Sequence, residues 1–179
     1  MISCKRNLKK HPESDECYTP EGTVKYLLQF IPEGVKTIWC PCDTEESNIV
    51  KELRQYGYDV IHTHIKDGFD FLNYQPIPGT FDMIITNPPF SNKSKILARA
   101  FEIGMPFIFY FPLTTLEGIS RHKLWKKYEI NIGVLSQRLE FTGGKGAWFN
   151  TSFFIGNVKY RDRLFWIDNS EQEKQIELF

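Results

Sequence analysis

Long apolar segments are scarce in the sequence, so we expect nothing in it to hold the protein in a membrane or to send it out of the cell. No apolar run among its 179 residues approaches the roughly 20 residues that a membrane-spanning helix needs. The start, MISCKRNLKK, has no apolar stretch of the length found in secretion signals. We therefore expect a cytoplasmic protein with no membrane contact.

Cysteine is scarce, and its positions do not form pairs. Cys4, Cys17, Cys40 and Cys42 show no Cys-x-x-Cys spacing, so we expect free thiols in a reducing compartment. Zinc bound by Cys40 and Cys42 is a weaker alternative, because no second pair and no nearby histidine completes four ligands. We expect no metal.

Excess charge is also absent, since 22 Lys and Arg balance 22 Asp and Glu. The chain as a whole is no polycation, so contact with a nucleic acid would depend on local basic patches. Three stretches are basic, 5–10, 91–99 and 120–128. Each is typical of an ordinary solvated surface, which is our interpretation of 5–10. The other two depend on where the fold places them.

Apolar residues make up 41% of the sequence and aromatic residues 15%, which indicates a folded globule. The length favours one domain, 1–179, with a core over about 17–157 and tails at 1–16 and 158–179. Apolar segments predict strands at 35–42, 58–65, 81–87, 106–112, within 130–141, and at 147–158. Helices are predicted at 19–31, 44–57, 91–104 and 119–128. This alternation predicts an α/β protein with a mostly parallel sheet and helices on both faces.

Several helix boundaries have local signals. Thr19 and Pro20 fit the N-cap and first position of the first helix, and Thr44 fits the N-cap of the second. Gly57 and Gly104 fit the ends of the second and third helices.

The strand at 81–87 runs into an unusual corner, Asn87-Pro88-Pro89-Phe90. Two prolines remove two backbone donors and end both helix and sheet, which leaves a rigid turn between an amide and an aromatic ring. Ligands of open α/β sheets bind beyond the carboxyl ends of the strands. His62 and His64 reach the same edge, where we expect them to be structural, hydrogen-bonded histidines.

The corner resembles the [Asn/Asp/Ser]-Pro-Pro-aromatic motif of S-adenosylmethionine-dependent amino methyltransferases. Three further segments resemble this family in the same order: CYTP (17–20), DGFDFL (67–72) and QRLEF…AWFNTSFF (137–154). Together they cover most of 17–157 and resemble small phage-type DNA adenine-N6 methyltransferases. The resemblance implies a Rossmann-like methyltransferase fold with a C-terminal antiparallel hairpin strand, S-adenosylmethionine as cofactor and DNA as partner.

The resemblance also implies site residues. The Asn87 side-chain oxygen and the Pro88 carbonyl would accept hydrogen bonds from the adenine amine, with Pro89 fixing the turn and Phe90 stacking on the flipped base. The expected cofactor-binding residues are Tyr18, Thr19, Pro20, Cys40, Asp43, Asp67, Asp70 and Phe71. The expected nucleic-acid contacts are Lys93, Lys95, Arg121, Lys123, Lys126, Lys127, Trp148 and Phe149, with Arg99 and Trp125 beside them.

The sequence departs from the family at the end of the first strand. WCPCDTEES (39–47) stands where the family has a glycine-rich acidic loop, and glycine there lets the backbone approach the cofactor closely. We therefore expect weaker cofactor binding than in relatives with that loop.

Three other interpretations stay open. The same corner suits methyl transfer to RNA adenine or to a protein glutamine amide. The missing glycines suit a non-catalytic binding protein on the same scaffold. The corner can also be a mere turn with Phe90 in the core. Target specificity would be weak, built from 120–128, or supplied by a second copy or a partner protein.

Overall fold

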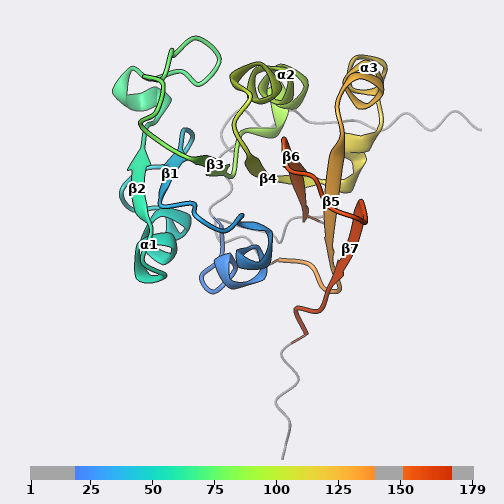
Figure 1. Ribbon diagram of the computed structural model, residues 1–179, viewed down its shortest axis with the longest axis horizontal. Coiled ribbons are helices and arrows are strands. Elements are labelled where there is room, and N and C mark those ends of the chain that lie inside the picture. Colours follow the sequence, from blue (N-terminus) through green and yellow to red (C-terminus); the bar gives the residue numbers. More distant parts are fainter. Residues whose placement is uncertain (1–18, 140–150, 171–179) are drawn as a thin grey trace, which may run out of the picture.

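The computed structural model describes residues 19–139 and 151–170, which form one seven-stranded sheet with helices on both faces (Figure 1). The strand order is β2-β1-β3-β4-β6-β5-β7. The strands are β1 (Thr37–Cys40), β2 (Asp59–His62), β3 (Met83–Thr86), β4 (Phe107–Pro112), β5 (Ile130–Leu135), β6 (Thr151–Gly156) and β7 (Leu164–Ile167).

The sheet is parallel except at β6. Strands β2, β1, β3 and β4 are mutually parallel, β6 is antiparallel to both β4 and β5, and β7 is parallel to β5. Every residue of β3, β4 and β6 is buried, as expected for strands covered on both faces. The predicted parallel sheet and antiparallel hairpin are therefore confirmed.

Helices cover the two faces in separate groups. The α-helices are α1 (Asn48–Gln55), α2 (Lys93–Ile103) and α3 (Ile119–Lys127). Figure 1 shows α1 on one face, with the 3₁₀ helices η1 (Val24–Tyr26) and η2 (Leu28–Phe30), and α2 and α3 on the other. In the part of the chain that the structure describes, no helix is long and apolar enough to cross a membrane.

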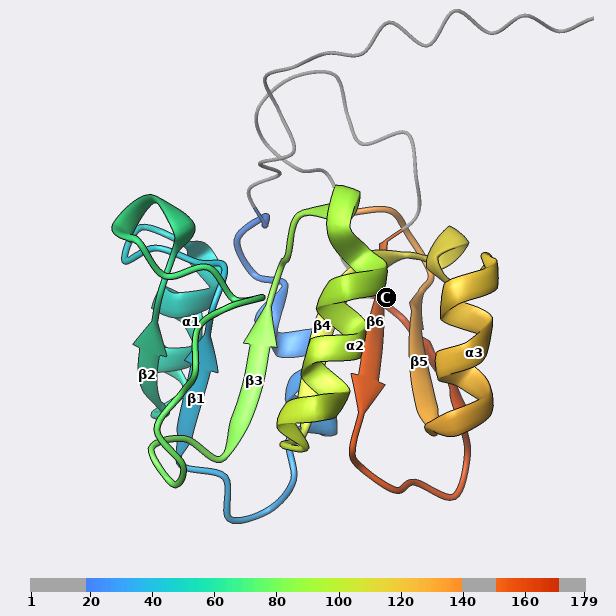
Figure 2. The ribbon, with the colours of Figure 1, turned by 90° about the horizontal axis from the view of Figure 1, so that it is seen from above.

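The direction of the strands fixes where a ligand can bind. In Figure 2, β1, β2 and β3 all point to the upper edge of the sheet, and α2 and α3 begin at that edge and run away from it. Residues that directly follow the parallel strands therefore gather at one edge, which we call the carboxyl edge.

The predicted helix at 19–31 is wrong, because this segment forms only the short helices η1 and η2. A side chain from α1 takes the backbone donors that would start a helix. The carboxylate of Glu52 accepts hydrogen bonds from the Gly22 N–H at 2.7 Å and from the Val24 N–H at 3.0 Å. Gly22 has a φ of 78°, outside the range of an α-helix.

Helix α1 begins at Asn48 and not at the predicted Thr44. The Ser47 N–H donates to the Thr44 carbonyl at 3.0 Å, which makes a separate turn before the helix. The two predicted glycine ends are confirmed, since Gly57 and Gly104 both have left-handed φ values, 90° and 80°.

Strand β7 was not predicted, and it lies within the expected tail at 158–179. Its residues alternate: Phe165 and Ile167 pack towards the core, whereas Leu164 and Trp166 are exposed by 49% and 77%. This period of two in LFWI was the available signal. Residues 147–150 of the predicted last strand lie outside the described residues.

The core contains two aromatic-rich layers, one on each face of the sheet. At the junction of β4 and β6, a Cβ on Gly156 would lie 2.2 Å from the Phe107 ring. Glycine is required here because the ring crosses the backbone of the neighbouring strand.

We predict that Glu52→Ala destabilises the protein by roughly 2–4 kcal/mol, because it leaves one buried and one partly buried backbone donor without their acceptor. Glu52 is only 6% exposed, so water does not readily replace the carboxylate. Urea unfolding would measure the change. The exposed Glu33 gives the control, since Glu33→Ala should shift the unfolding free energy by less than about 0.5 kcal/mol. Equal stability of the two variants would contradict this role of Glu52.

Candidate functional site

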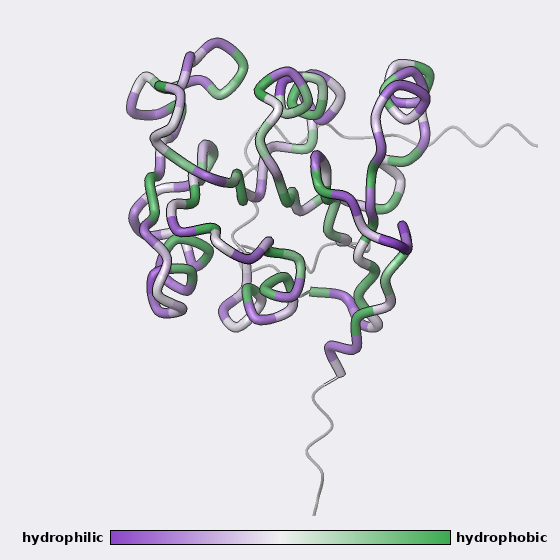
Figure 3. Tube along the Cα trace, in the orientation of Figure 1, coloured by the Kyte–Doolittle hydropathy of each residue, from purple (hydrophilic) through white to green (hydrophobic). Residues whose placement is uncertain are grey.

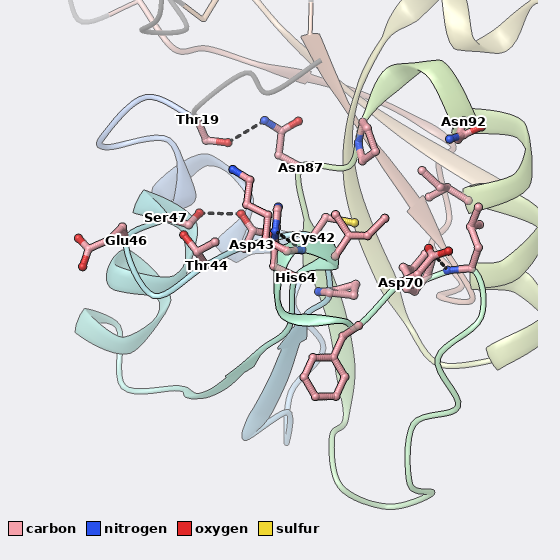
Figure 4. Close-up of a pocket in the computed structure, with 18 of the residues that line it drawn as sticks. Thr19, Cys42, Asp43, Thr44, Glu46, Ser47, His64, Asp70, Asn87 and Asn92 are labelled. Carbon is pink, nitrogen blue, oxygen red and sulfur yellow. Dashed lines mark hydrogen bonds between the residues drawn. The ribbon is translucent and has the colours of Figure 1, made fainter. Parts of the chain in front are cut away.

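A cavity of about 580 Å³ opens at the carboxyl edge, between the ends of β1, β2 and β3 and the start of α1 (Figure 4). Its volume is within the range of pockets for small molecules and cofactors. Figure 3 shows hydrophilic and hydrophobic residues interspersed along the chain. The lining residues are Thr19, Pro41, Cys42, Asp43, Thr44, Glu46, Ser47, Asn48, His64, Ile65, Lys66, Phe69, Asp70, Phe71, Leu72, Asn87, Pro89, Asn92 and Ile96.

Asp43 is the buried centre of the site. Its carboxylate accepts hydrogen bonds from the Ser47 hydroxyl at 2.6 Å and the Thr86 hydroxyl at 2.5 Å, and also from the Asn87 backbone N–H. The Thr86 hydroxyl in turn accepts from the Cys42 N–H at 3.2 Å. One carboxylate thus joins the loop after β1, the end of β3 and the residue before α1.

Burial dominates the electrostatics of this centre. Desolvation raises the pKa of Asp43 above its ordinary value, although the hydrogen bonds from Ser47, Thr86 and Asn87 work in the other direction. Burial and the nearby Asp43 also raise the pKa of the Cys42 thiol, which keeps the sulfur protonated and unreactive.

The glycine-free loop makes its turn without unusual backbone angles. Among the described residues, the only non-glycine residue with a positive φ is Asn157, far from this loop. The loop is closed by the side-chain bond between Ser47 and Asp43 and by the turn from Thr44 to Ser47. Glycine is therefore not needed here to turn the chain.

The Asn-Pro-Pro-Phe corner forms one wall of the cavity. Asn87 directly follows β3, and its side-chain nitrogen donates to the Thr19 hydroxyl at 3.1 Å (Figure 4). Pro88 is buried and Pro89 lines the cavity. Phe90 is half-buried beside Phe111, with 6.0 Å between ring centroids.

The opposite wall is a turn after β2. The Asp70 carboxylate accepts from the Leu72 N–H at 3.0 Å and from the Asn73 side chain at 2.7 Å, which holds the turn together. The predicted Phe71 is 4% exposed and packs 5.6 Å from the Trp39 ring. Phe69, which was not predicted from the sequence, lines the cavity and is 39% exposed.

The structure brings together four of the predicted cofactor-binding residues, Thr19, Asp43, Asp70 and Phe71. Three others do not line the cavity. Cys40 is fully buried in the core, Asp67 is exposed, and Pro20 lies just beyond Thr19. Tyr18 lies outside the described residues.

Sequence reasoning missed several lining residues besides Phe69, mainly Ser47, Asn48, Ile65 and Lys66. The positions of Ser47 and Asn48 follow from where α1 begins, which was predicted four residues too early. Ile65 and Lys66 belong to a short 3₁₀ turn capped by the His64 ring, whose Nδ1 accepts from the Lys66 N–H at 3.1 Å. This contact supports the structural role expected for His64, and His62 lies 2.7 Å from the Glu45 carboxylate.

Two predicted basic residues lie beside the corner. Lys93 is the first residue of α2 and Lys95 lies in its first turn, so both are at the carboxyl edge. Partial burial and the neighbouring Arg121 lower the pKa of Lys93. A positive charge next to another positive charge favours an anion nearby.

Arg121, Trp125 and Arg99 have internal roles that the sequence did not indicate. The Arg121 guanidinium donates to the carbonyls of Thr115 (2.7 Å) and Glu117 and to the Ser94 hydroxyl. The Trp125 indole donates to the Leu116 carbonyl at 3.1 Å and packs on the sheet. Arg99 donates to the Tyr74 carbonyl at 3.0 Å, so it too binds a loop of its own chain.

Lys126 and Lys127 do not lie at the carboxyl edge, which corrects their expected position. They form the last turn of α3, which ends where β5 begins, at the opposite edge of the sheet. Lys127 packs 4.8 Å above the Tyr128 ring. Lys123 is exposed midway along α3, and Trp148 and Phe149 lie outside the described residues.

Within residues 19–139 and 151–170, no group of three or more His, Cys, Asp or Glu side chains could hold a metal ion. Burial raises the pKa of Cys40 well above its ordinary value, which disfavours the thiolate that zinc needs.

No protein-family model matches the sequence, and no curated protein matches it. The fold matches a solved structure from Listeria monocytogenes, described as a candidate class I S-adenosylmethionine-dependent methyltransferase, with a TM-score of 0.53 and 15% identity. The match covers 81% of this chain and 62% of the other, so the chain spans less than two thirds of that protein. At this identity the likeness concerns the fold alone. The chain has the Rossmann-like fold of class I methyltransferases, as its sequence predicted.

Proposed function

We propose that the protein transfers a methyl group from S-adenosylmethionine to the N6 amine of adenine in DNA. The observation that supports this most directly is the position of the Asn-Pro-Pro-Phe corner. Asn87 and Pro89 line a cofactor-sized cavity at the carboxyl edge, within a methyltransferase fold.

The lining residues fit S-adenosylmethionine, a cationic nucleoside that supplies an electrophilic methyl group when bound. The carboxylates of Asp43 and Asp70 suit its positive groups and its amines. Ile65, Phe69 and Leu72 offer apolar surface to a flat base. Lys66 on the same wall suits a carboxylate.

The corner has the groups that the amine chemistry needs. The lone pair of an adenine amine is delocalised into the ring, so it is a weak nucleophile. Two acceptors directed at its N–H groups, the Asn87 side-chain oxygen and the Pro88 carbonyl, would withdraw it from conjugation. Asn87 cannot ionise, so its contribution is the position of an acceptor, and Phe90 would hold the flipped base by stacking.

DNA is the favoured partner because Lys93 and Lys95 flank the corner at the first turn of α2. Phosphates on both sides of a flipped nucleotide would meet these ammonium groups. The basic end of α3 lies at the opposite edge of the sheet from the corner.

We predict measurable but weak binding of S-adenosylmethionine that strengthens as the pH rises through the raised pKa of Asp43. Because burial raises the pKa of Asp43, this carboxylate gains its charge at a higher pH than an exposed aspartate does. Its attraction for a cation is therefore absent below that pKa and present above it. Calorimetric titration at several pH values would measure the effect.

Asp43→Asn should weaken the binding at a pH above this raised pKa and flatten its pH dependence. Glu46→Gln is the matched control, because Glu46 also lines the cavity but is exposed and paired with Lys51 at 2.6 Å. Its pH dependence should follow that of the wild type. A lack of binding at about millimolar ligand, at the upper end of the KM range of typical enzymes, would favour a non-catalytic protein.

Asn87→Ala should reduce methyl transfer by on the order of a hundredfold or more, the usual effect of removing one preorganised polar group. Incorporation of tritiated methyl groups into adenine-containing DNA would measure it, with the melting temperature as a test of folding. Full activity of Asn87→Ala would show that the corner is only a turn.

Phe90→Ala should cost ~1–3 kcal/mol of transition-state stabilisation because the stacking surface is removed, whereas Phe90→Tyr should keep most of the activity. Phe90 is half-buried beside Phe111, so its replacement can also affect folding. The unfolding free energy of both variants should therefore be measured together with their activity. A decrease of ~3–5 kcal/mol in the unfolding free energy would instead identify Phe90 as a core residue.

Replacing Lys93 and Lys95 together by Ala should weaken DNA binding and reduce its salt dependence. The slope of log K against log salt should fall in magnitude by about 0.9 for each phosphate that is no longer neutralised. The control is the double replacement of Lys126 and Lys127, at the opposite edge of the sheet, which should leave the slope unchanged. If the two double variants behave alike, the charges beside the corner belong to an ordinary solvated surface.

A further inference from the structure

We propose that Thr19 is a positioning residue, whose hydroxyl sets the orientation of the Asn87 side-chain amide for the proposed methyl transfer. The amide nitrogen of Asn87 donates to the Thr19 Oγ1 at 3.1 Å. Figure 4 shows the nitrogen turned towards Thr19 and the oxygen pointing away from it. This inference rests on the proposed function, because it concerns which end of the amide meets the substrate.

An asparagine side chain needs such a contact because its two ends are almost equivalent in shape. The terminal torsion of asparagine is broad and roughly two-fold, so a half-turn exchanges oxygen and nitrogen. Only the oxygen can accept a hydrogen bond from the substrate amine; the NH₂ group can only donate. In the observed orientation the Thr19 hydroxyl accepts from the NH₂ group, which leaves the oxygen as the end of the amide that faces away from Thr19.

Thr19 can serve as this partner because its own position is fixed from α1. Thr19 is 5% exposed, and its backbone carbonyl accepts from the Asn48 side chain at 2.9 Å. One turn further along α1, Glu52 holds the Gly22 and Val24 N–H groups. Asn48 and Glu52 are four residues apart, on one face of the helix, and together they fasten the segment 19–24 beside the corner.

This arrangement also connects the cofactor side of the proposed site with the corner that would bind the substrate amine. Asn48 lines the cavity at the start of α1, and the same side chain holds Thr19. The contacts therefore run from the cofactor side, through Asn48 and Thr19, to the amide that would meet the substrate amine.

Steady-state kinetics of Thr19→Val, which removes the hydroxyl and keeps the shape, separates positioning from cofactor binding. We expect kcat at saturating S-adenosylmethionine to fall about three- to tenfold, the scale of one net hydrogen bond. The dissociation constant for S-adenosylmethionine should stay unchanged, and Thr19→Ser should restore kcat. Thr19→Ala should repeat the decrease in kcat if valine is not tolerated.

The matched control is Thr80→Val, which removes an exposed hydroxyl that donates only to a neighbouring loop carbonyl, that of Ile77, at 2.8 Å. It should leave both constants unchanged. If Thr19→Val instead weakened the binding of S-adenosylmethionine and left kcat unchanged, Thr19 would be a cofactor ligand and the proposal would be overturned.

A second measurement needs no activity, so it distinguishes a failure of this inference from a failure of the proposed function. The side-chain NH₂ resonances of Asn87 can be assigned in ¹⁵N spectra by their disappearance in Asn87→Ala. In Thr19→Val we expect these protons to shift and to exchange faster with water, while Thr19→Ser keeps the wild-type values. Unchanged Asn87 resonances in Thr19→Val would overturn the positioning role, whether or not the wild type transfers methyl groups.

Discussion

The site depends on a single buried carboxylate. Asp43 has three donors from three different segments: Ser47 before α1, Thr86 at the end of β3, and the backbone of Asn87. A buried charge is costly unless such donors surround it, so the loop after β1 and the corner after β3 stabilise one another. The shape of the cavity floor and the position of Asn87 are therefore two results of the same interaction.

Much of the fold could be predicted because its signals are local. The apolar strands β1, β3 and β4 are short runs between turn residues, and the corner after β3 is marked by two prolines. The segment 19–31 was mispredicted because its donors bind Glu52, a residue some 30 positions away that no local pattern reveals. Strand β7 was not predicted because its alternation of exposed and buried residues extends over only four positions.

The sequence could predict which edge of the sheet carries the site, but not which side chains line it. Strand order places Asp43, Asp70 and Asn87 together. Which of Phe69 and Phe71 is exposed in the cavity depends on which ring packs in the core, and the ring that packs there, beside Trp39, is that of Phe71. The basic residues show the same limit. Lys93 and Lys126 both lie on helices that start at the carboxyl edge, but only the first turn of a helix stays at that edge.

The insertion of β6 between β4 and β5 has a consequence for the order of folding. Strands β1 to β4 are neighbours of one another in the sheet, whereas β5 has no place beside β4 until β6 enters between them. The ring of Phe107 must then close over Gly156, a contact between residues about 50 positions apart. All residues of the Asp43 centre belong to the part of the chain that is synthesised before β5 begins. The half that carries the proposed chemistry is thus the half that is synthesised first.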